Sequence, residues 1–416
     1  MGTFSYIGPI TEVLTMDQLP INGAVPDSAL PMLKDAGILM QGERIHTLGK
    51  HKDVLAVAKE LKAEITLLNS PVVAIPGLID CHTHICFSGS RARDYALRNA
   101  GTSYLEIAKA GGGIWDTVTQ TRAATEEALA EGIIQRATNH LHQGVTTIEV
   151  KSGYGLSLPH ELKMLQAIAK ANASISADLI STCLAAHMFP EDFEGSKMEY
   201  LEMMAEQLLP MIKKENLSYR VDAFIEEGAF SKAEIAPYFN KATSLGFDIT
   251  VHADQFSVGG SEVAVQYKAR SADHLEASTP KEINLLAKSD VIAVALPGAS
   301  MGLGCNFTPA RALLDAGASV AIASDHNPGS APMGQLLTQA AILGAFEKLT
   351  TAEVFAGITH RAAAALGLKD RGVLVKGMLA DLALFKTPDH REILYQQGSL
   401  QPSVVIKKGA LVYSNL

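Results

Sequence analysis

Short apolar runs and helix-period segments alternate along the middle of this chain. The runs are rich in Val, Ile, Leu and Ala, and amphipathic stretches such as 126–144 and 159–173 lie between them. Strand and helix in alternation over roughly 290 residues predict a parallel sheet, and this many units favour a (β/α)8 barrel. After a first run at 76–84, the strands are expected at 146–154, 179–187, 219–227, 247–254, 271–276, 291–298 and 320–329.

A doubly wound sheet is the alternative α/β architecture. It commonly carries a GxGxxG turn between a strand and a helix, where a dinucleotide binds. The glycine-rich segment here, AGGGIWD at 110–116, follows a helix-like stretch instead. Dinucleotide binding is therefore disfavoured.

The two ends of the chain share a different pattern. Residues 36–50 predict two strands around a tight QGE turn, while 372–386 and 402–414 alternate apolar and polar residues between glycine turns. We expect both ends to pair into one smaller β-sandwich module. The expected division is 1–70 plus 372–416 for this module and 71–371 for the barrel.

Composition narrows the class of protein. With 47% hydrophobic and 19% charged residues among 416, the chain has enough apolar side chains for a large core. A net charge of -9 without long Lys/Arg runs argues against nucleic acid or an anionic membrane as partner. No uncharged apolar stretch reaches about 18 residues, so no spanning helix is expected. Four cysteines without CxxC spacing and no signal-like N-terminus predict reduced thiols in the cytoplasm.

Two histidines end the first predicted strand, in PGLIDCHTH. Side chains alternate along a strand, so His82 and His84 should point the same way. Other polar residues end the later runs, and the carboxyl ends of barrel strands converge on one face, where active sites lie. These residues are Lys151, Tyr154, His187, Glu226, Glu227, His252, His274 and Asp325.

This set of residue types points to a metal. Three histidines (His82, His84, His252) and the carboxylate of Asp325 suit one zinc or iron ion and leave room for a water. A bound metal lowers the pKa of water from 15.7 to about 7. Lys151 could instead be a carbamylated bridge between two metals, although a single metal is preferred.

These motifs, taken together, resemble those of a known family. The H-x-H with a late Asp is similar to the amidohydrolase superfamily. The stretches EVKSGYGL, AAH, HADQ, SADHLE and ASDHNPGSAP, with residues 76–118, resemble its imidazolonepropionase family over about 70–380. The resemblance implies hydrolysis of the cyclic amide C–N bond of 4-imidazolone-5-propanoate, giving N-formimidoyl-L-glutamate in histidine degradation.

The resemblance also assigns residues. It implies the metal ligands His82, His84, His252 and Asp325, with His274 and Asp325 catalytic. Arg91 is implied at the substrate, with Arg93 and Arg98 as rivals on the same loop. Further implied substrate contacts are Tyr104, Tyr154, His187, Asn327, Gly329 and Ser330.

One position departs from the family. Some members carry a glutamate where this chain has Gln255, and a glutamine cannot take up a proton. Gln255 is expected to hold the ring by hydrogen bonds instead. Asp325 is then the expected proton acceptor. His274 is expected to polarise the carbonyl, with orientation of His252 as its alternative role.

Two other functions remain open. One is a different cyclic amidase or a deaminase of the superfamily. The other is a catalytically inactive barrel kept as a binding module, although all four candidate ligands are retained here. A homodimer is expected only because two-fold assemblies are the commonest.

Overall fold

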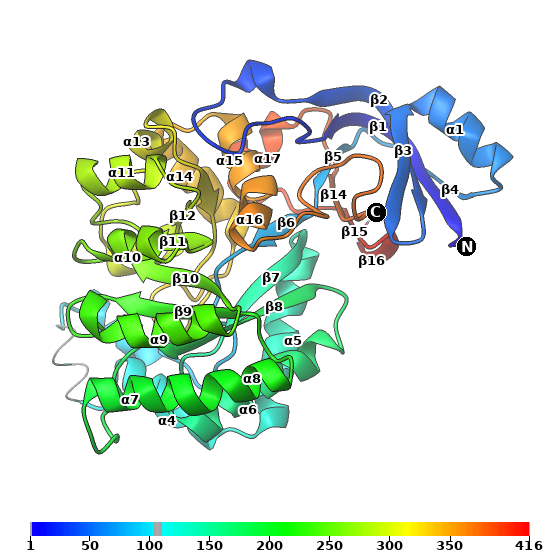
Figure 1. Cartoon of the computed structure of the whole chain (residues 1–416). Coiled ribbons are helices and arrows are strands. Elements are labelled where there is room, and N and C mark those ends of the chain that lie inside the picture. The colour runs from blue at the N-terminus through cyan, green and yellow to red at the C-terminus, as the bar shows by residue number, and fades with distance from the viewer. Residues whose placement is uncertain (1, 103–105, 107–109, 416) are drawn as a thin grey trace.

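The chain folds around an eight-stranded parallel barrel (Figure 1). We describe a computed structural model that covers residues 2–102, 106 and 110–415. Strands β6 to β13 are neighbours in the order of the sequence, which confirms the predicted (β/α)8 architecture. Their bounds are β6 Leu78–Asp80, β7 Val145–Lys151, β8 Asp178–Ala186, β9 Arg220–Ile225, β10 Asp248–Ala253, β11 Ser271–His274, β12 Ile292–Ala295 and β13 Val320–Ile322.

The first and last strands meet beyond their own ends. The amide of Asp325 donates to the carbonyl of His82 at 3.1 Å, and the amide of His84 donates to that of His326 at 2.9 Å. Thr83 and His326 form an isolated parallel bridge. The ring is therefore closed at its carboxyl end by the segments that carry the candidate ligands.

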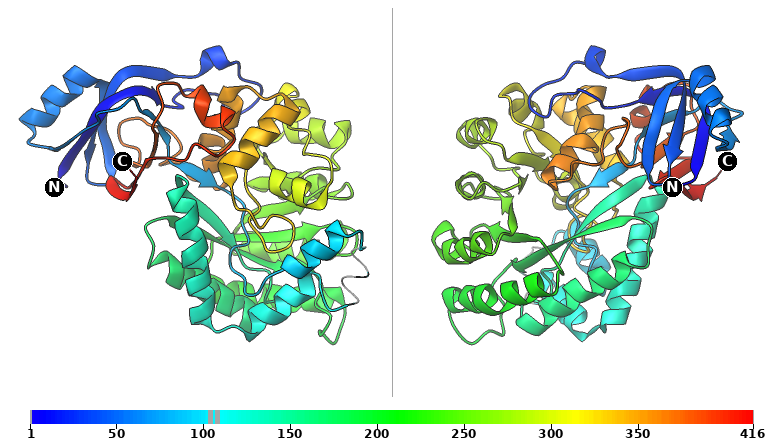
Figure 2. Two further views of the ribbon diagram at one scale, coloured as in Figure 1. Left: turned by 180° about the vertical axis from the view of Figure 1, so that it is seen from behind. Right: turned by 45° about the vertical axis from the view of Figure 1, so that its right-hand side comes forward.

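Helices surround the barrel on its outer side (Figure 2). Several begin at side-chain caps; in α9, for example, Ser231 and Glu234 form a reciprocal capping box. None in the described part of the chain is both long and apolar enough to cross a membrane. The barrel helices are α2 Ala92–Asn99, α4 Ile114–Ala123, α5 Glu126–His142, α6 Leu158–Asn172, α7 Lys197–Met203, the π-helical η2 Met204–Leu208, α8 Leu209–Lys214, α9 Lys232–Ser244, α10 Gly260–Gln266, α11 Pro280–Ala287, α12 Pro297–Leu303, α13 Ala310–Asp315, α14 Leu336–Glu347, α15 Thr351–Gly357 and α16 His360–Ala365.

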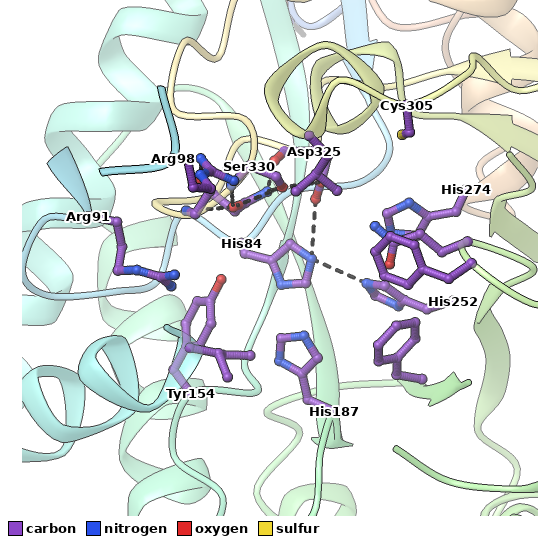
Figure 3. Close-up of a pocket in the computed structure, with 17 residues that line it drawn as sticks. His84, Arg91, Arg98, Tyr154, His187, His252, His274, Cys305, Asp325 and Ser330 are labelled. Carbon is purple, nitrogen blue, oxygen red and sulfur yellow. Dashed lines mark hydrogen bonds and ion pairs between the residues drawn. The ribbon is translucent and has the colours of Figure 1, made fainter. Parts of the chain in front are cut away.

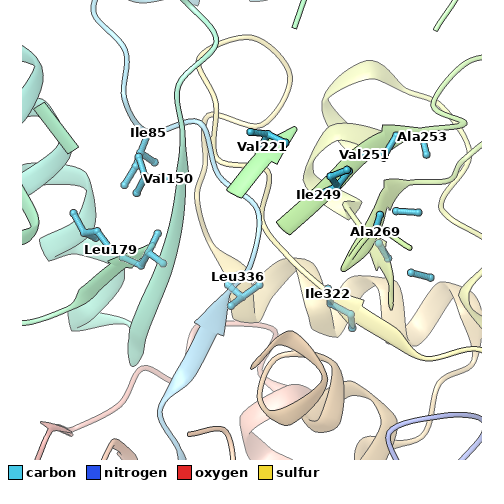
Figure 4. Packing of buried hydrophobic residues seen from close by; sticks show 14 of the residues in the cluster. Ile85, Val150, Leu179, Val221, Ile249, Val251, Ala253, Ala269, Ile322 and Leu336 are labelled. Atoms are coloured by element: carbon cyan, nitrogen blue, oxygen red, sulfur yellow. The ribbon is translucent and has the colours of Figure 1, made fainter. Parts of the chain in front are cut away.

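The main core lies between the barrel strands and these helices. Val150, Leu179, Val221, Val251 and Ile322 belong to one buried apolar cluster that spans five strands (Figure 4). Strands of a parallel barrel are covered on both faces, which explains why their sequences are nearly continuous apolar runs. This rigid frame fixes where the polar strand ends lie.

Both termini form a second, mixed sheet. Its strands run in the order β16-β15-β14-β5-β1-β2-β3, with β4 paired to β1. The sheet bends on itself, since the amide of Ala380 before β14 donates to the carbonyl of Glu43 in the β2–β3 turn at 2.8 Å. The elements are β1 Phe4–Leu14, η1 Asp27–Ala29, β2 Met32–Gln41, β3 Arg44–Lys50, α1 His51–Glu60, β4 Glu64–Leu67, β5 Val73–Pro76, β14 Leu382–Phe385, α17 Arg391–Tyr395, β15 Val404–Lys407 and β16 Ala410–Ser414.

Strand β5 extends this sheet past the expected boundary at residue 70. It pairs with β1 on one side and β14 on the other, with Leu382 opposite Pro76. The sheet therefore runs to Pro76, two residues before the first barrel strand.

Candidate metal centre and active site

His82 and His84 lie just beyond β6, which ends at Asp80. The expectation that they sit within a strand is corrected in this detail. The segment nevertheless stays beside its neighbour, because the Thr83 carbonyl accepts from the Lys151 amide at 3.0 Å. The two rings point to the same side, and their Nε2 atoms are 3.2 Å apart.

His252 and Asp325 complete the cluster. Nε2 of His252 lies 3.3 Å from Nε2 of His84, and Oδ1 of Asp325 lies 3.5 and 3.4 Å from Nε2 of His82 and His84. A tetrahedral ion with ligands at about 2.1 Å requires ligand atoms about 3.4 Å apart. The three histidines and the aspartate therefore have the spacing and donor types of a single metal site. Figure 3 shows His84, His252 and Asp325 of this set.

Burial keeps the three imidazoles in their metal-binding form. Burial lowers the pKa of His82 and of His84 well below the usual value, and neighbouring groups, led by Lys151 for His82 and the His252 ring for His84, lower it further. Burial also lowers the pKa of His252 to about 3, despite the opposing effect of Asp222. Neutral imidazole is the form that binds a transition metal.

Two carboxylates hold the outer nitrogens of these rings. Oδ2 of Asp273 lies 2.6 Å from Nδ1 of His82, and Oδ2 of Asp222 lies 2.9 Å from Nδ1 of His252. Such partners fix the tautomer that leaves Nε2 free for the ion. Neither residue stands out in the sequence, because Asp222 lies inside β9 and Asp273 inside β11 rather than after a strand.

Lys151 lies between these carboxylates. Its ammonium is 2.9 Å from Asp222, 2.8 Å from Glu149 and 3.8 Å from Asp273. Burial opposes the charge, but the three carboxylates outweigh it and raise the pKa of Lys151. A carbamate forms on a neutral amine, so this environment favours a structural ammonium and a single metal over a bridged pair.

A pocket of about 510 Å³ opens beside the cluster. It gathers most of the residues proposed from the sequence, whereas Tyr104 lies outside the described residues. Five other lining residues had no signal in the sequence: Ile114, Phe224, Phe256, Leu303 and Cys305. The proposed residues that line it are His84, Arg91, Tyr154, His187, His252, Gln255, His274, Asp325, Asn327, Gly329 and Ser330.

His274 lies on the far side of the cluster from Arg91 (Figure 3). Its Nδ1 is 3.5 Å from Oε2 of Glu276, and this carboxylate raises the pKa of His274 although burial opposes it. Its ring centroid is 5.3 Å from that of His252. His252 is already oriented by Asp222, so nothing here favours the alternative role of His274 as its support.

Tyr154 and His187 form one wall. The His187 ring stacks on His84 with centroids 5.4 Å apart and an interplanar angle of 18°, and its Nδ1 lies 2.9 Å from the Gly153 carbonyl. Burial raises the pKa of Tyr154, which keeps its hydroxyl protonated. The wall offers flat surfaces and hydrogen-bonding groups to a small ring.

The loop after Asp325 is braced by Asn327. Its side-chain Nδ2 donates to Oδ2 of Asp325 at 2.9 Å. Its side-chain Oδ1 accepts from the backbone amides of Gly329 and Ser330 at 2.7 and 2.8 Å. Burial raises the pKa of Asp325 to about 6, although His274 opposes the rise. The backbone of Asp325 has φ 50°, an uncommon conformation that this bracing supports.

The two cysteines beside the histidine pair have no part in the pocket. Cys81 and Cys86 are both buried in apolar clusters. The prediction that they serve core packing agrees with this placement.

The sequence matches a family model over most of its length. The model, described as the amidohydrolase family, covers residues 102–413. Together with the barrel, this shows the class: the chain belongs to the amidohydrolase family.

Curated relatives give a narrower placement. The chain is 40% identical to an imidazolonepropionase of Acinetobacter baumannii, over 91% of this chain and 94% of the relative. It is 37% identical to the imidazolonepropionase of Paracidovorax citrulli, over 93% of each. Within the amidohydrolases, the chain is thus a member of the imidazolonepropionase family.

Solved structures agree with the fold. An atrazine chlorohydrolase from Arthrobacter aurescens, complexed with zinc and atraton, superposes with a TM-score of 0.71 over 99% of this chain and 95% of its own. The sequence identity is 17%, so this likeness speaks for the architecture alone.

Proposed function

We propose that this protein hydrolyses the cyclic amide C–N bond of 4-imidazolone-5-propanoate to N-formimidoyl-L-glutamate. The observation that carries the proposal is the convergence of His82, His84, His252 and Asp325 beside a pocket of about 510 Å³, in a member of the imidazolonepropionase family. The substrate is a small molecule that carries a carboxylate, and the pocket wall contains two arginines.

The four ligands hold one zinc or iron ion in this proposal. Nitrogen and oxygen donors in this number suit both metals. The related atrazine chlorohydrolase was crystallised with zinc, which supports zinc as the first metal to test. When bound, the metal polarises a water molecule so that the water can attack at neutral pH.

Asp325 and His274 perform the proton and charge steps. The Asp325 carboxylate, beside the ligand nitrogens, accepts a proton from the attacking water and returns it to the departing ring nitrogen. His274, held by Glu276, donates a hydrogen bond to the carbonyl oxygen as negative charge develops there. Gln255 lines the pocket but has no carboxylate, so it holds the ring and takes no proton.

The remaining pocket residues bind and orient the substrate. Tyr154 and His187 pack against the ring and hydrogen-bond it, while Arg91 offers its guanidinium N–H groups to an oxygen atom of the substrate. The backbone at Gly329 and the Ser330 hydroxyl border the same space, positioned by Asn327. Tyr104 is proposed as a further contact from the resemblance alone.

The test is a product assay with the purified protein. We expect loss of imidazolone absorbance and formation of N-formimidoyl-L-glutamate, without ammonia release from cytosine or guanine. His82→Ala and Asp325→Ala should lose almost all turnover, because each removes a proposed ligand. Release of ammonia with imidazolone left intact would assign the protein to the deaminases instead. No bound metal and no activity after adding metal would favour an inactive binding module.

Three further predictions belong with this proposal. The chain is proposed to divide into a barrel unit ending at residue 371 and a β module from both ends, with the first boundary moved from residue 70 to Pro76 because β5 belongs to the module. A cytoplasmic location is proposed because all four cysteines are free thiols. A homodimer is proposed on symmetry alone and is tested by light scattering.

A further inference from the structure

Two arginines from the same stretch of chain reach one point of the pocket wall, Gly329. Arg98 Nη2 donates to the Gly329 carbonyl at 3.0 Å. Arg91 Nη1 lies 3.5 Å from the position that a Cβ on Gly329 would take. Both guanidinium groups line the pocket (Figure 3). The sequence resemblance favours Arg91 at the substrate and keeps Arg98 as a rival.

The two cations differ in how they are neutralised. Arg91 is paired through Nε with the buried carboxylate of Asp94, which also accepts the Gly113 amide at 2.9 Å. Within the described residues, Arg98 has no carboxylate at ion-pair distance. Besides Gly329, it contacts the ring of Tyr95, 6.0 Å from the centroid. Arg98 is therefore the pocket cation whose charge the described part of the chain leaves unbalanced.

The position of Arg98 is coupled to the reactive end of the pocket. The Gly329 amide donates to Oδ1 of Asn327 at 2.7 Å, and Nδ2 of the same Asn327 donates to Asp325 at 2.9 Å. A short, braced loop thus sets the distance between the Arg98 guanidinium and the candidate metal ligand. A substrate whose carboxylate lies at a fixed distance from its ring can therefore place the carboxylate at Arg98 and the ring beside Asp325.

We propose that Arg98 is a specificity-determining residue that binds the substrate's tail carboxylate. This inference rests on the proposed function and deepens it. A half-buried cation that has no carboxylate partner among the described residues attracts an anion, and the planar guanidinium fork matches a carboxylate. Arg91, neutralised by Asp94, directs its remaining N–H groups to the side of the pocket where Tyr154 lies (Figure 3).

The first experiment measures binding by calorimetry on the full-length, metal-loaded protein. The probes are 3-(imidazol-4-yl)propanoate, which has the tail carboxylate but no scissile amide, and its neutral propanamide. Arg98→Gln should weaken binding of the carboxylate about 10- to 100-fold, the range for a hydrogen bond to a charged group. Binding of the propanamide should change less than about threefold, because this neutral probe forms no ion pair with Arg98 that the substitution could remove.

Two control variants and a turnover assay accompany this variant. Arg93→Gln removes an exposed arginine of the same helix and should change neither affinity. Arg98→Lys keeps the charge but loses the fork, so it should fall between the wild type and Arg98→Gln. In turnover assays with 4-imidazolone-5-propanoate, Arg98→Gln should raise KM and largely preserve kcat.

Two results would overturn the inference. Equal weakening for both probes would show that Arg98 acts only by holding the Gly329 loop. Unchanged affinity of Arg98→Gln for the carboxylate probe would show that Arg98 does not bind the tail and would favour Arg91 in that role. Selective loss of carboxylate binding in Arg98→Gln, together with a wild-type protein that fails to hydrolyse the imidazolone, would support the inference and contradict the proposed function.

Discussion

Oδ2 of Asp222 lies 2.9 Å from Nδ1 of His252, on the side of the ring away from the other candidate ligands. Burial alone would raise the pKa of Asp222, but His252 and Lys151 hold it below its usual value. The carboxylate therefore stays ionised and keeps the proton on Nδ1. This leaves Nε2 of His252 free to bind the ion.

Asp222→Asn should weaken metal binding about 10- to 100-fold, as is typical when the partner of a ligand histidine is lost. The measurement is competition with a chelator of known affinity, which needs no enzymatic activity. Asp248→Asn, at the half-exposed start of β10, is the control and should leave affinity unchanged. Equal affinities for Asp222→Asn and the wild type would show that the ring is held by packing alone.

Lys151→Met should destabilise the fold by about 3–5 kcal/mol, because it leaves buried carboxylates without their cation. Unfolding by denaturant of the metal-free protein measures the free energy without a contribution from bound metal. Lys170→Met, which removes an exposed lysine beside Glu127, should cost less than about 1 kcal/mol. A loss for Lys151→Met as small as that for Lys170→Met would contradict a structural ion-pair network.

His274→Ala should lower kcat about 10²- to 10³-fold, the usual effect of removing a hydrogen bond to a developing oxyanion. The metal content of the variant, measured by elemental analysis, should match the wild type because His274 is not among the proposed ligands. Loss of metal in this variant would show instead that His274 supports the centre itself.

His360 should make stability depend on pH. Burial, and then the neighbouring Arg361, lower its pKa to about 4 in the folded protein. The unfolded chain binds the proton near pH 6.5, so the contribution is complete above that pH and declines as pH falls toward 4.

For this one group, the free energy of unfolding should fall by about 2 kcal/mol between pH 6.5 and 5. His360→Gln should reduce the total loss by up to this amount, whereas exposed His142→Gln should not change it. The check is denaturant unfolding at pH 7.5 and 5. Identical pH dependence in His360→Gln and the wild type would show that this ring is not kept neutral by the fold.

The strand positions could be predicted closely where both faces of the sheet are buried. The run 247–254 became β10, Asp248–Ala253, with His252 near its end. The prediction was less accurate where strands give way to the site. The run 320–329 holds a strand only at Val320–Ile322, because the chain then turns through Asp325 to form the braced loop. Local periodicity does not record a turn that hydrogen bonds to distant segments stabilise.

The sequence by itself determined the barrel, the β module from both ends and the residues gathered at the carboxyl face. These follow from local apolar periodicity and from the rule that parallel strand ends converge. Only the tertiary structure decided which acidic and basic side chains pair with one another. Asp273 meets His82 across 191 positions, Asp222 meets Lys151, and Asp94 neutralises Arg91 while Arg98 has no acidic partner in the described chain. Such pairings depend on distances of a few ångströms between strands and loops, which no pattern along the chain specifies.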